Sequence, residues 1–465
     1  MRTFSLFAAF VLAAVASVGN AAEDRPNIVL LFADDAGYAD FGFQGSKHFR
    51  TPHLDMLASS GVVLKTLYTS AAVCGPSRAG LLTGRYQQRF GFEENNVPGW
   101  MSPSSKLLGD EMGLPLSEQT IADHLQSLGY RTAVFGKWHL GATEALHPLS
   151  RGFDEFVGFR GGARTYFALN HPGRPENRLE RGRGTYREHE GYLTDALAEE
   201  ACDFIRRHRD RPFFAFVSFN AVHAPMEADP ADAATFANLK GTRRTAAQMM
   251  LSLDRACGRI VDQLAELGLE ENTLVVFTND NGGPMDRNGS SNYPLSGVKG
   301  THLEGGIRVP GVAVWPGRLP AGETYEEPVS TLDLLPTFVA AGGGDTDAID
   351  GLDGVNVLPF LIGEASGRPH ETLYWKCESR AAIRDGDWKL IRYPDRPAEL
   401  FDVMSDPGEQ QDLAIEHPER TRELFRKLFA WEVELERPLF QAQRKAEVWS
   451  SKRADEFHTP PPADY

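Results

Sequence analysis

Two pairs of oxygen-bearing side chains each follow a run of apolar residues in this chain. Asp34 and Asp35 come shortly after NIVLLF, and Asp280 and Asn281 come shortly after TLVVFT. Carboxylate and amide oxygens are hard ligands that suit Ca²⁺ or Mg²⁺, whereas zinc prefers histidine and cysteine. We expect these residues to bind one divalent cation, with Ca²⁺ favoured because it tolerates irregular sites with more ligands. The plain alternative treats each residue as a helix cap or a turn former.

A cysteine and an arginine stand one helical turn apart in the run CGPSR, residues 74–78. Cys74 opens a short predicted helix, and Pro76 suits a first helical turn because proline has no amide hydrogen to leave unpaired. The positive end of this helix favours an anion that develops beside residue 74. The plain alternative is a buried structural cysteine in a loop.

Lysines and histidines follow other apolar runs. Lys137 and His139 come just after RTAVF, His223 comes shortly after FFAFVSF, and Lys299 lies in the later segment GVKG. Taken singly, each lysine is more often a solvated surface residue. In open parallel sheets, however, ligands bind where the carboxyl ends of the strands meet. We therefore expect these groups to join the metal ligands at one sheet edge, where they can clamp an anionic group and transfer protons.

Apolar runs alternate with helical patterns from residue 27 to about 340. This alternation predicts an α/β fold with a large, mainly parallel sheet flanked by helices. Periodicity and terminal glycines predict helices over residues 119–128, 194–208 and 245–267. Residues 341–356 are rich in glycine and aspartate, which indicates a linker or a surface loop.

The pattern changes after residue 370. Four short strands are predicted, at residues 372–377, 380–384, 388–393 and 399–402. With a helix over residues 418–435, they predict a smaller C-terminal antiparallel sheet packed against one helix. We expect a catalytic domain over residues 23–370 and a small subdomain with a tail over residues 371–465. The tail after about residue 445 ends in a proline run and is expected to be loosely held.

The first 22 residues have the pattern of a secretory signal peptide, with Arg2 at the start, an apolar run and small residues at the end. The run is short for a membrane span, so an N-terminal anchor is the weaker alternative. We expect export to the periplasm or the outside, without stable membrane insertion. The net charge of −16 disfavours nucleic-acid binding. Four cysteines are too few for a disulfide-stapled scaffold, although they allow one disulfide.

Several motifs are similar to those of the type I sulfatases, within the alkaline-phosphatase-like superfamily. CGPSRAGLLTGR at residues 74–85 resembles the motif around the modified cysteine, and GYRTAVFGKWH at residues 129–139 resembles the second sulfatase motif. Residues 33–40 and 278–283 resemble the two metal segments of that family, and GVKG resembles its substrate-lysine segment. The resemblance covers nearly all of residues 26–440.

The resemblance implies an enzyme that hydrolyses sulfate esters with a modified cysteine. A formylglycine-generating enzyme oxidises Cys74 to formylglycine (3-oxoalanine), and one hydroxyl of the hydrated aldehyde, held by Arg78 and the metal, attacks sulfur. The second hydroxyl lets sulfate leave, which a serine or cysteine nucleophile does not offer. Asn279, a departure from the serine of many relatives, is expected to matter little, and Asp40 is expected to be structural. The implied metal ligands are Asp34, Asp35, Cys74, Asp280 and Asn281.

The resemblance also implies roles for the cationic groups. Lys137 and Lys299 hold sulfate oxygens, and His223, with Lys299, protonates the departing alcohol. His139 then takes the proton from the second hydroxyl. Two alternatives stay open, a phosphonate or phosphodiester hydrolase of the same superfamily and a catalytically inactive glycan-binding relative. The full set of site residues argues against the inactive relative.

Residues 159–190 hold seven arginines, an unusual density in an acidic chain. A solvated loop is the plain interpretation, and the sharper one is a subsite in which arginine binds sulfate or carboxylate groups of an anionic polymer. GFDEF and the glycine and aromatic run after it resemble bacterial exported sulfatases that act on algal or host glycans. A sulfated carbohydrate is therefore the expected substrate. The candidate substrate-binding residues are Arg160, Arg164, Arg183 and His302, with His171 and His189 as weaker candidates.

Overall fold

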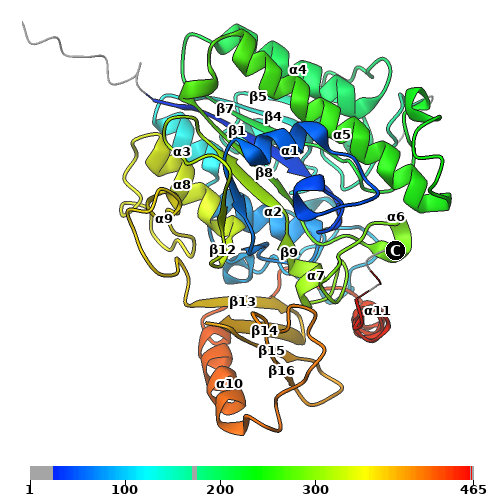
Figure 1. The fold of residues 1–465 in the computed structure, drawn as a ribbon, viewed down its shortest axis with the longest axis vertical. Coiled ribbons are helices and arrows are strands. Elements are labelled where there is room, and N and C mark those ends of the chain that lie inside the picture. Colours follow the sequence, from blue (N-terminus) through cyan, green and yellow to red (C-terminus); the bar gives the residue numbers. More distant parts are fainter. Residues whose placement is uncertain (1–24, 170–174, 461, 463–465) are drawn as a thin grey trace, which may run out of the picture.

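The structure is a computed structural model that describes residues 25–169, 175–460 and 462. Within these residues, a nine-stranded sheet crosses the larger part of the molecule between layers of helices (Figure 1). From one edge to the other, its strands are β11 (Glu323–Tyr325), β2 (Val62–Leu64), β10 (Gly311–Val314), β8 (Thr273–Asn279), β1 (Asn27–Ala33), β7 (Phe213–Ser218), β4 (Arg131–Lys137), β5 (Glu155–Phe159) and β6 (Glu180–Arg181).

The centre of this sheet is parallel. Strands β8, β1, β7, β4 and β5 run in one direction, whereas β10 and β6 are antiparallel to their neighbours β8 and β5. Every residue of β1 is buried, because apolar layers cover both faces of the sheet, and this explains its unbroken apolar run. The predicted fold class, a large and mainly parallel sheet flanked by helices, is confirmed.

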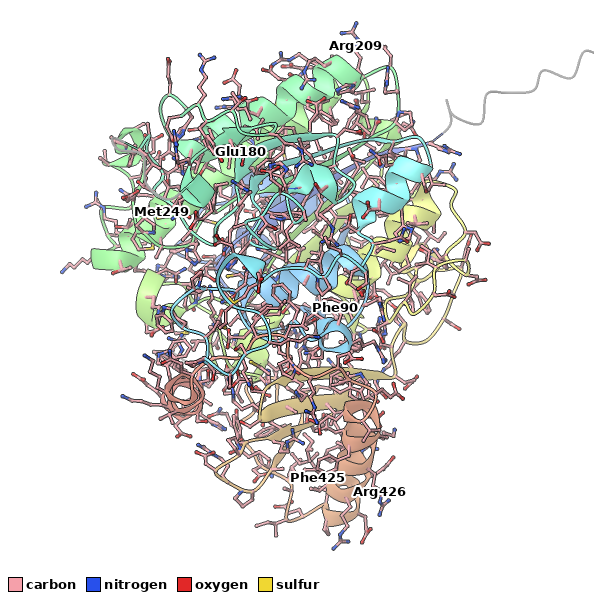
Figure 2. All side chains as sticks on the ribbon, turned by 180° about the vertical axis from the view of Figure 1, so that it is seen from behind. Phe90, Glu180, Arg209, Met249, Phe425 and Arg426 are labelled. Carbon is pink, nitrogen blue, oxygen red and sulfur yellow. The ribbon has the colours of Figure 1, made fainter. Side chains whose placement is uncertain are left out.

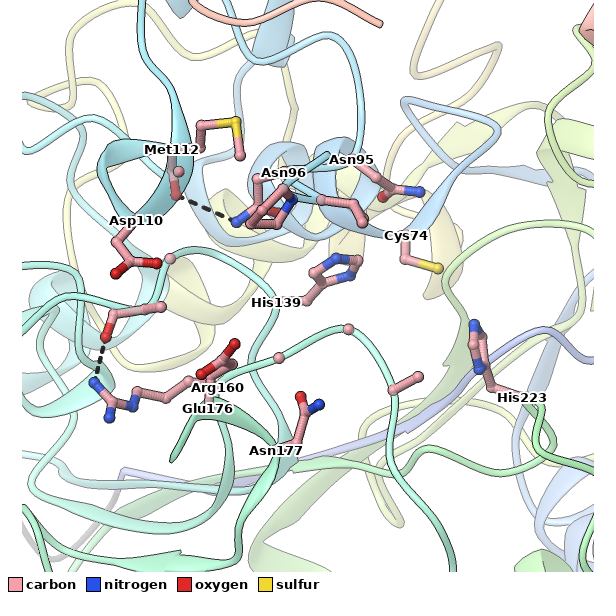
Figure 3. A pocket seen from close by; sticks show the side chains of 18 of the residues that line it. Cys74, Asn95, Asn96, Asp110, Met112, His139, Arg160, Glu176, Asn177 and His223 are labelled. Atoms are coloured by element: carbon pink, nitrogen blue, oxygen red, sulfur yellow. Dashed lines mark hydrogen bonds between the residues drawn. The ribbon is translucent and has the colours of Figure 1, made fainter. Parts of the chain in front are cut away.

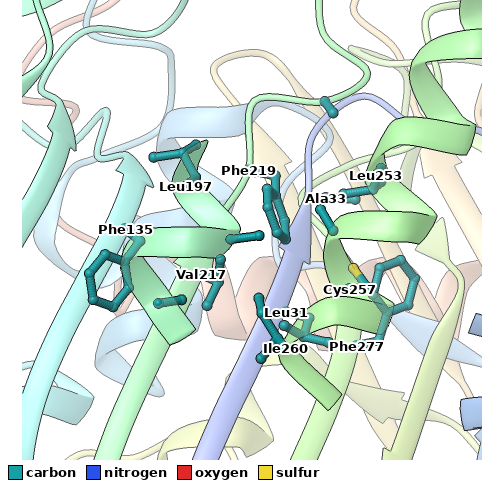
Figure 4. Packing of buried hydrophobic residues seen from close by; sticks show 14 of the residues in the cluster. Leu31, Ala33, Phe135, Leu197, Val217, Phe219, Leu253, Cys257, Ile260 and Phe277 are labelled. Atoms are coloured by element: carbon teal, nitrogen blue, oxygen red, sulfur yellow. The ribbon is translucent and has the colours of Figure 1, made fainter. Parts of the chain in front are cut away.

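Helices cover the two faces of the sheet with separate apolar cores. One face packs against α1 (Pro52–Ser59), α4 (Leu193–His208) and α5 (Gly241–Glu266). Figure 4 shows Leu197 of α4 and Ile260 of α5 close to strand residues such as Val217. The other face packs against α2 (Cys74–Thr83), α3 (Ile121–Ser127) and α8 (Leu334–Ala341). Three single-turn helices lie in the connections, α6 (Met285–Asn288), α7 (Glu304–Ile307) and α9 (Leu358–Leu361).

The predicted helices are present with shifted ends. The helix expected from residue 119 begins at Ile121, because Thr120 and Asp123 form a capping box in which each side chain accepts a hydrogen bond from the other's backbone N–H. The loop predicted over residues 341–356 is present from residue 342, because Ala341 is the last residue of α8. Asp353 in this connection binds the guanidinium of Arg89 at 2.9 Å.

The C-terminal unit is a four-stranded antiparallel sheet with one helix, as predicted. Its strands are β13 (Thr372–Cys377), β14 (Arg380–Asp385), β15 (Trp388–Arg392) and β16 (Glu399–Asp402). Helix α10 (Pro418–Glu432) packs Leu424 and Leu428 onto this sheet. A small sheet of β12 (Val329–Ser330), β3 (Leu67–Tyr68) and β9 (Arg308–Val309) lies in the larger part of the molecule.

The expectation of a loosely held tail is wrong for most of its residues. A further helix, α11 (Arg444–Glu456), follows the small subdomain. Arg453 on this helix is buried, forms an ion pair with Asp286 and stacks over the ring of Trp449 at 4.4 Å from the ring centroid. The ring of Trp449 in turn lies against Gly300. These contacts hold the segment against the larger domain.

Residues 437–443, which we call the C-terminal strap, run beside the loop of residues 91–107. The N–H of Leu439 donates to the carbonyl of Gly91 at 2.8 Å, and the carbonyl of Leu439 accepts from the N–H of Leu107 at 2.9 Å. The strap therefore fixes a loop that is more than 300 residues away in the chain.

The predicted signal peptide, residues 1–22, lies outside the described residues. Among the residues that are described, no helix has the length and apolar character needed to cross a bilayer. All four cysteines are buried free thiols, so the structure contains no disulfide among them.

Candidate active site

The two pairs of predicted metal ligands leave neighbouring strands at the same sheet edge. Strands β1 and β8 are hydrogen-bonded partners, with Ala33 opposite Asn279. Asp34 and Asp35 therefore emerge beside Asp280, and the backbone N–H of Asp35 donates to the Asp280 carboxylate at 3.2 Å. The parallel register thus brings together residues that are about 245 positions apart.

The donor set at this edge fits a hard divalent cation. Ligand atoms of Asp34, Asp35, Cys74 and Asp280 all lie within 4.8 Å of one another, and all four residues are buried. Oδ1 of Asn281 is also buried and accepts no hydrogen bond from any described residue. Three carboxylates with an orphaned amide oxygen form an oxygen-rich site of the kind that Ca²⁺ binds.

The carboxylates share strong neighbouring charges. Burial and the nearby Asp280 raise the pKa of Asp34 to about 8, although Lys137 donates to it at 2.6 Å. Burial also acts to raise the pKa of Asp35, but Lys299 at 2.6 Å and His223 outweigh it and hold that pKa below the usual range. Packing three carboxylates this closely is costly unless cationic groups offset their charge.

Cys74 is the first residue of α2, with its Sγ 3.7 Å from Oδ1 of Asp34 and 3.0 Å from Nζ of Lys299. Burial raises the pKa of its thiol to about 12, so the unmodified cysteine is a weak nucleophile. The side chain of Asn95 accepts a hydrogen bond from the N–H of Gly75 at 2.7 Å and so satisfies one free donor at the helix start.

A serine that the sequence did not single out joins two of the cations. Arg78 donates to Oγ of Ser218 at 2.6 Å, and Ser218 donates to the backbone carbonyl of Lys137 at 2.7 Å. The other end of the Arg78 guanidinium lies 3.1 Å from Asp280. Ser218 is the last residue of β7. This position at the end of a strand is the one signal in the sequence that could have located it near the site.

Both predicted histidines reach the site. Nε2 of His223 lies 3.5 Å from Oδ2 of Asp35, and Nδ1 contacts the Ala224 carbonyl at 2.6 Å. Burial lowers the pKa of His223 to about 4 and, with the charges of Lys137 and Arg78, holds that of His139 well below its usual value. A Cβ on Gly162 would lie 2.6 Å from Nε2 of His139, so only glycine fits beside this ring.

A cavity of about 390 Å³ opens above these groups. Cys74, His139, His223 and Lys299 line its inner end, and Figure 3 shows the sulfur of Cys74 and both histidine rings facing the same space. This volume lies within the ~300–1,000 Å³ range of small-molecule sites. The cavity is therefore large enough for a ligand beyond the reacting group itself.

Of the candidate substrate-binding residues, Arg160 lines the cavity. Arg164 forms a 2.6 Å ion pair with Glu188 and is not among the lining residues. Arg183 is more exposed and pairs with Glu144 at 2.6 Å, also away from the lining.

The three candidate histidines have different surroundings. His302 is buried, and burial with the charge of Arg380 holds its pKa well below the usual value. His189 is buried and contacts the Tyr166 carbonyl. Neither ring lines the cavity, and His171 lies outside the described residues.

Two residues treated as minor in the sequence have structural roles. Asn279 clamps the metal segment, because its side chain donates to the Ala36 carbonyl at 2.8 Å and accepts from the Ala36 N–H at 3.3 Å. Asp40 is buried, pairs with Arg243 at 2.6 Å and accepts from the N–H of Ser291. The contacts of Asp40 are those of a structural residue. Asn279 was expected to matter little, but its two hydrogen bonds hold the segment that carries the metal ligands.

Comparison with known proteins gives a consistent result. Residues 26–344, more than half of the chain, match the family model described as Sulfatase. Steryl-sulfatase of Mus musculus is 33% identical over 89% of this chain and 82% of its own length. N-acetylgalactosamine-6-sulfatase of Canis lupus familiaris is 34% identical over 82% of this chain and 74% of its own length. The solved structure of Ps i-CgsB in complex with k-i-k-neocarrahexaose has a TM-score of 0.84 at 35% identity, and the match covers 92% of this chain and 98% of that one.

Proposed function

This chain belongs to the sulfatase family and is a sulfuric ester hydrolase, and we propose that it releases sulfate from a sulfated carbohydrate with residue 74 in its formylglycine form. The position of Cys74 carries this proposal. It begins a helix, contacts Lys299 at 3.0 Å and lies beside three buried carboxylates. The proposed nucleophile, a cation that can hold sulfate and a set of metal ligands therefore lie next to one another.

The proposed reaction converts a sulfate ester R–O–SO₃⁻ and water into the alcohol R–OH, sulfate and a proton. A hydroxyl of the hydrated residue 74 loses its proton and forms a bond to sulfur, while the bond between sulfur and the alcohol oxygen breaks and that oxygen gains a proton. The second hydroxyl then loses its proton, the bond from residue 74 to the sulfate oxygen breaks, and the aldehyde is restored. Water adds to the aldehyde and regenerates the hydrated residue 74.

Three fixed positive charges surround the reacting group. Lys299 contacts residue 74, while Lys137 is fully buried and held by Asp34 at 2.6 Å. Arg78 is held between Asp280 and Ser218. Because these groups are already oriented, they stabilise the negative charge on the sulfate oxygens without reorganising during the reaction.

The two histidines carry the proton transfers. Nδ1 of His223 donates to the Ala224 carbonyl, so Nε2 is the nitrogen that faces the reacting groups and protonates the departing alcohol oxygen. The incoming sulfate ester is an anion, and its charge favours the protonated form of His223. His139, at the inner end of the cavity, takes the proton from the second hydroxyl of residue 74.

Asp34, Asp35, Asp280 and Asn281, with residue 74, would hold Ca²⁺ better than Mg²⁺. The cation supplies positive charge that acidifies a hydroxyl and holds a sulfate oxygen. After EDTA has removed bound metal ions and has itself been removed, adding Ca²⁺ should raise the melting temperature of the protein in scanning calorimetry. The rise should be smaller for Asn281→Ala. An unchanged rise in Asn281→Ala would remove Asn281 from the ligand set.

The carbohydrate substrate is supported by two named similarities. One solved structure with the same fold holds a neocarrahexaose, and one relative is an N-acetylgalactosamine-6-sulfatase. We also propose export through the signal peptide at residues 1–22, conversion by a formylglycine-generating enzyme, and a division into a catalytic domain over 23–370 and a subdomain over 371–465.

The central test compares Cys74→Ala with Cys257→Ala, which alters another buried thiol in α5. Cys74→Ala should abolish sulfate release from 4-nitrophenyl sulfate while leaving thermal unfolding unchanged, and Cys257→Ala should keep its activity. Mass spectrometry of the tryptic peptide that contains residue 74 should show the aldehyde in the active protein. Full turnover by Cys74→Ala, or faster cleavage of an aryl phosphonate than of the aryl sulfate, would overturn the proposal.

A further inference from the structure

The outer part of the cavity has two facing walls (Figure 3). One wall comes from residues 95–98 with 109, 110 and 112, and the other comes from residues 160–163 and 176–177. The C-terminal strap holds the first wall through the loop of residues 91–107. The alcohol that leaves from sulfur must lie between these walls, because the catalytic groups close the inner end.

Arg160, the cationic group in these walls, already contacts neighbouring polar groups of the protein. Nε of Arg160 lies 3.1 Å from Oε2 of Glu180, and another guanidinium nitrogen donates to the hydroxyl of Tyr186 at 3.0 Å. A third nitrogen donates to the Ala142 carbonyl. The charge of Arg160 is therefore already paired with Glu180, which weakens its attraction for an anionic group of the substrate.

The other ionisable groups in these walls, within the described residues, are the carboxylates of Asp110 and Glu176. Arg164 and Arg183, in the segment before α4, do not line the cavity and are each paired with a glutamate. A second anionic group on the substrate would therefore meet like charge in the outer cavity, which disfavours binding.

Polar side chains without partners point to the kind of ligand that fits. Oδ1 of Asn96 is buried and has no hydrogen-bond partner in the described chain, while its Nδ2 donates to the Met112 carbonyl at 3.3 Å. On the same wall, the Asp110 carboxylate has no hydrogen bond or ion pair with other described residues, and the same holds for the Asn177 amide opposite. Free acceptors of this kind are matched by the hydroxyl groups of a sugar ring.

We propose that this cavity takes a sugar ring that is neutral apart from the sulfate to be removed, and that Asn96 and Asp110 set this specificity. The proposal rests on the sulfatase function proposed above and narrows its substrate class. Hydroxyl groups of the ring fill the acceptors of Asn96 and Asp110, and an alcohol without hydroxyls leaves them unpaired at a cost. A second sulfate or a uronate carboxylate beside the reacting ester is repelled by Asp110.

The test uses the full chain with residue 74 converted, as verified by peptide mass. Sulfate release is measured for 4-nitrophenyl sulfate, for the 4- and 6-monosulfates of galactose and N-acetylgalactosamine, and for N-acetylgalactosamine 4,6-disulfate. At least one monosulfate should exceed the disulfate in kcat/KM by about 10-fold or more, because like charges oppose the second sulfate. A disulfate that reacts as well as the best monosulfate would overturn the proposal.

Variants assign the effect to the named residues. Asp110→Lys should narrow the gap between monosulfate and disulfate by about 10-fold, as expected when like charge is replaced by opposite charge. Glu111→Lys is the matched control, because Glu111 is the exposed neighbour of Asp110 and does not line the cavity. Asn96→Ala should lower kcat/KM for the monosulfate by about 10-fold more than for the aryl sulfate, the order expected for one lost polar contact.

These outcomes distinguish a failure of the proposed sugar specificity from a failure of the proposed sulfatase function. If no substrate releases sulfate, aryl sulfate included, the proposed function itself fails. If the aryl sulfate reacts but no monosulfate does, or if Asp110→Lys behaves like Glu111→Lys, the sulfatase function stands and the neutral-sugar specificity fails.

Discussion

Ser218 shows how one small side chain orients the anion clamp. Its hydroxyl accepts from Arg78 and donates to the Lys137 carbonyl, so it links a guanidinium to the strand that carries a second cation. All three residues are buried, where a polar group without a partner costs about 1–3 kcal/mol. The cations of the proposed anion clamp therefore depend on a residue that has no charge and no proposed role in the chemistry.

Ser218→Ala should lower kcat for 4-nitrophenyl sulfate by about 10-fold or more, because an Arg78 nitrogen loses its best partner and the guanidinium is freed to turn. Steady-state kinetics provide the measurement. Ser252→Ala is a suitable control, since Ser252 is a buried hydrogen-bonded serine in α5, away from the cavity lining. An unchanged kcat in Ser218→Ala would show that the contacts of Arg78 with Asp280 and with the Lys137 carbonyl, each at 3.1 Å, are enough to orient it.

At the scale of elements, α2 depends on a side chain from outside the helix. The N-cap residue Val73 makes no side-chain cap, and Asn95 supplies the acceptor for the N–H of Gly75. A Cβ on Gly75 would lie 3.1 Å from that oxygen, so glycine at this position allows the close approach. The loop after α2 thus folds back and fixes the helix turn that holds residue 74.

Asn95→Ala should lower the free energy of unfolding by about 1 kcal/mol, the usual cost of losing a helix cap. Asn95→Asp, which keeps the accepting oxygen, should recover that loss in chemical denaturation. Equal stabilities for the asparagine and alanine proteins would mean that the helix start is held by packing alone.

The strand ends could be predicted from the sequence, and the contacts between them could not. Each catalytic strand is an apolar run followed at once by polar residues, so Asp34 and Lys137 were placed at the sheet edge by pattern alone. Ser218 gains its role from the pairing of β7 with β4, and Asn95 from a loop that returns to α2. Such contacts depend on register and loop path, which no local pattern reports. Helix α11 was missed because its anchor, the Arg453 ion pair, is a tertiary contact.

At the scale of the whole molecule, a buried charge cluster joins the small subdomain to the larger domain. Nζ of Lys389 on β15 lies 2.9 Å from Glu304 of α7 and 2.8 Å from Glu409, and all three residues have 0% exposure. The hydroxyl of Tyr68 also donates to Glu304 at 2.7 Å. A buried charge that loses its partner is strongly unfavourable, so this junction tolerates little change.

Lys389→Met should destabilise the protein by about 3–5 kcal/mol, because it leaves the buried Glu409 without its cation and leaves Glu304 with Arg308 alone, at 3.6 Å. Denaturant unfolding measures this loss. Lys427→Met, which removes a more exposed lysine paired with Asp385, should cost about 0–1 kcal/mol. Similar losses in the two variants would contradict a special role for the buried junction.

The same cluster predicts a pH dependence. Burial raises the pKa of Glu409 to about 7, against the opposing charge of Lys389. The folded protein therefore binds a proton here more tightly than the unfolded chain does, and this contribution to stability is full below pH 4.5, the ordinary value, and lost as pH rises towards about 7. Glu409→Gln should flatten that part of the stability–pH curve. An unaltered curve would assign the titration to another group.

The C-terminal strap bears on the order in which residue 74 is modified and the cavity wall folds. Residues 437–443 hold the loop that supplies one cavity wall, yet they are synthesised more than 360 residues after residue 74. In the finished fold residue 74 is 1% exposed, so a macromolecular enzyme cannot reach it there. The proposed oxidation would therefore have to precede folding of this wall, and a chain that folds unmodified would enclose a thiol that the modifying enzyme can no longer convert to an aldehyde.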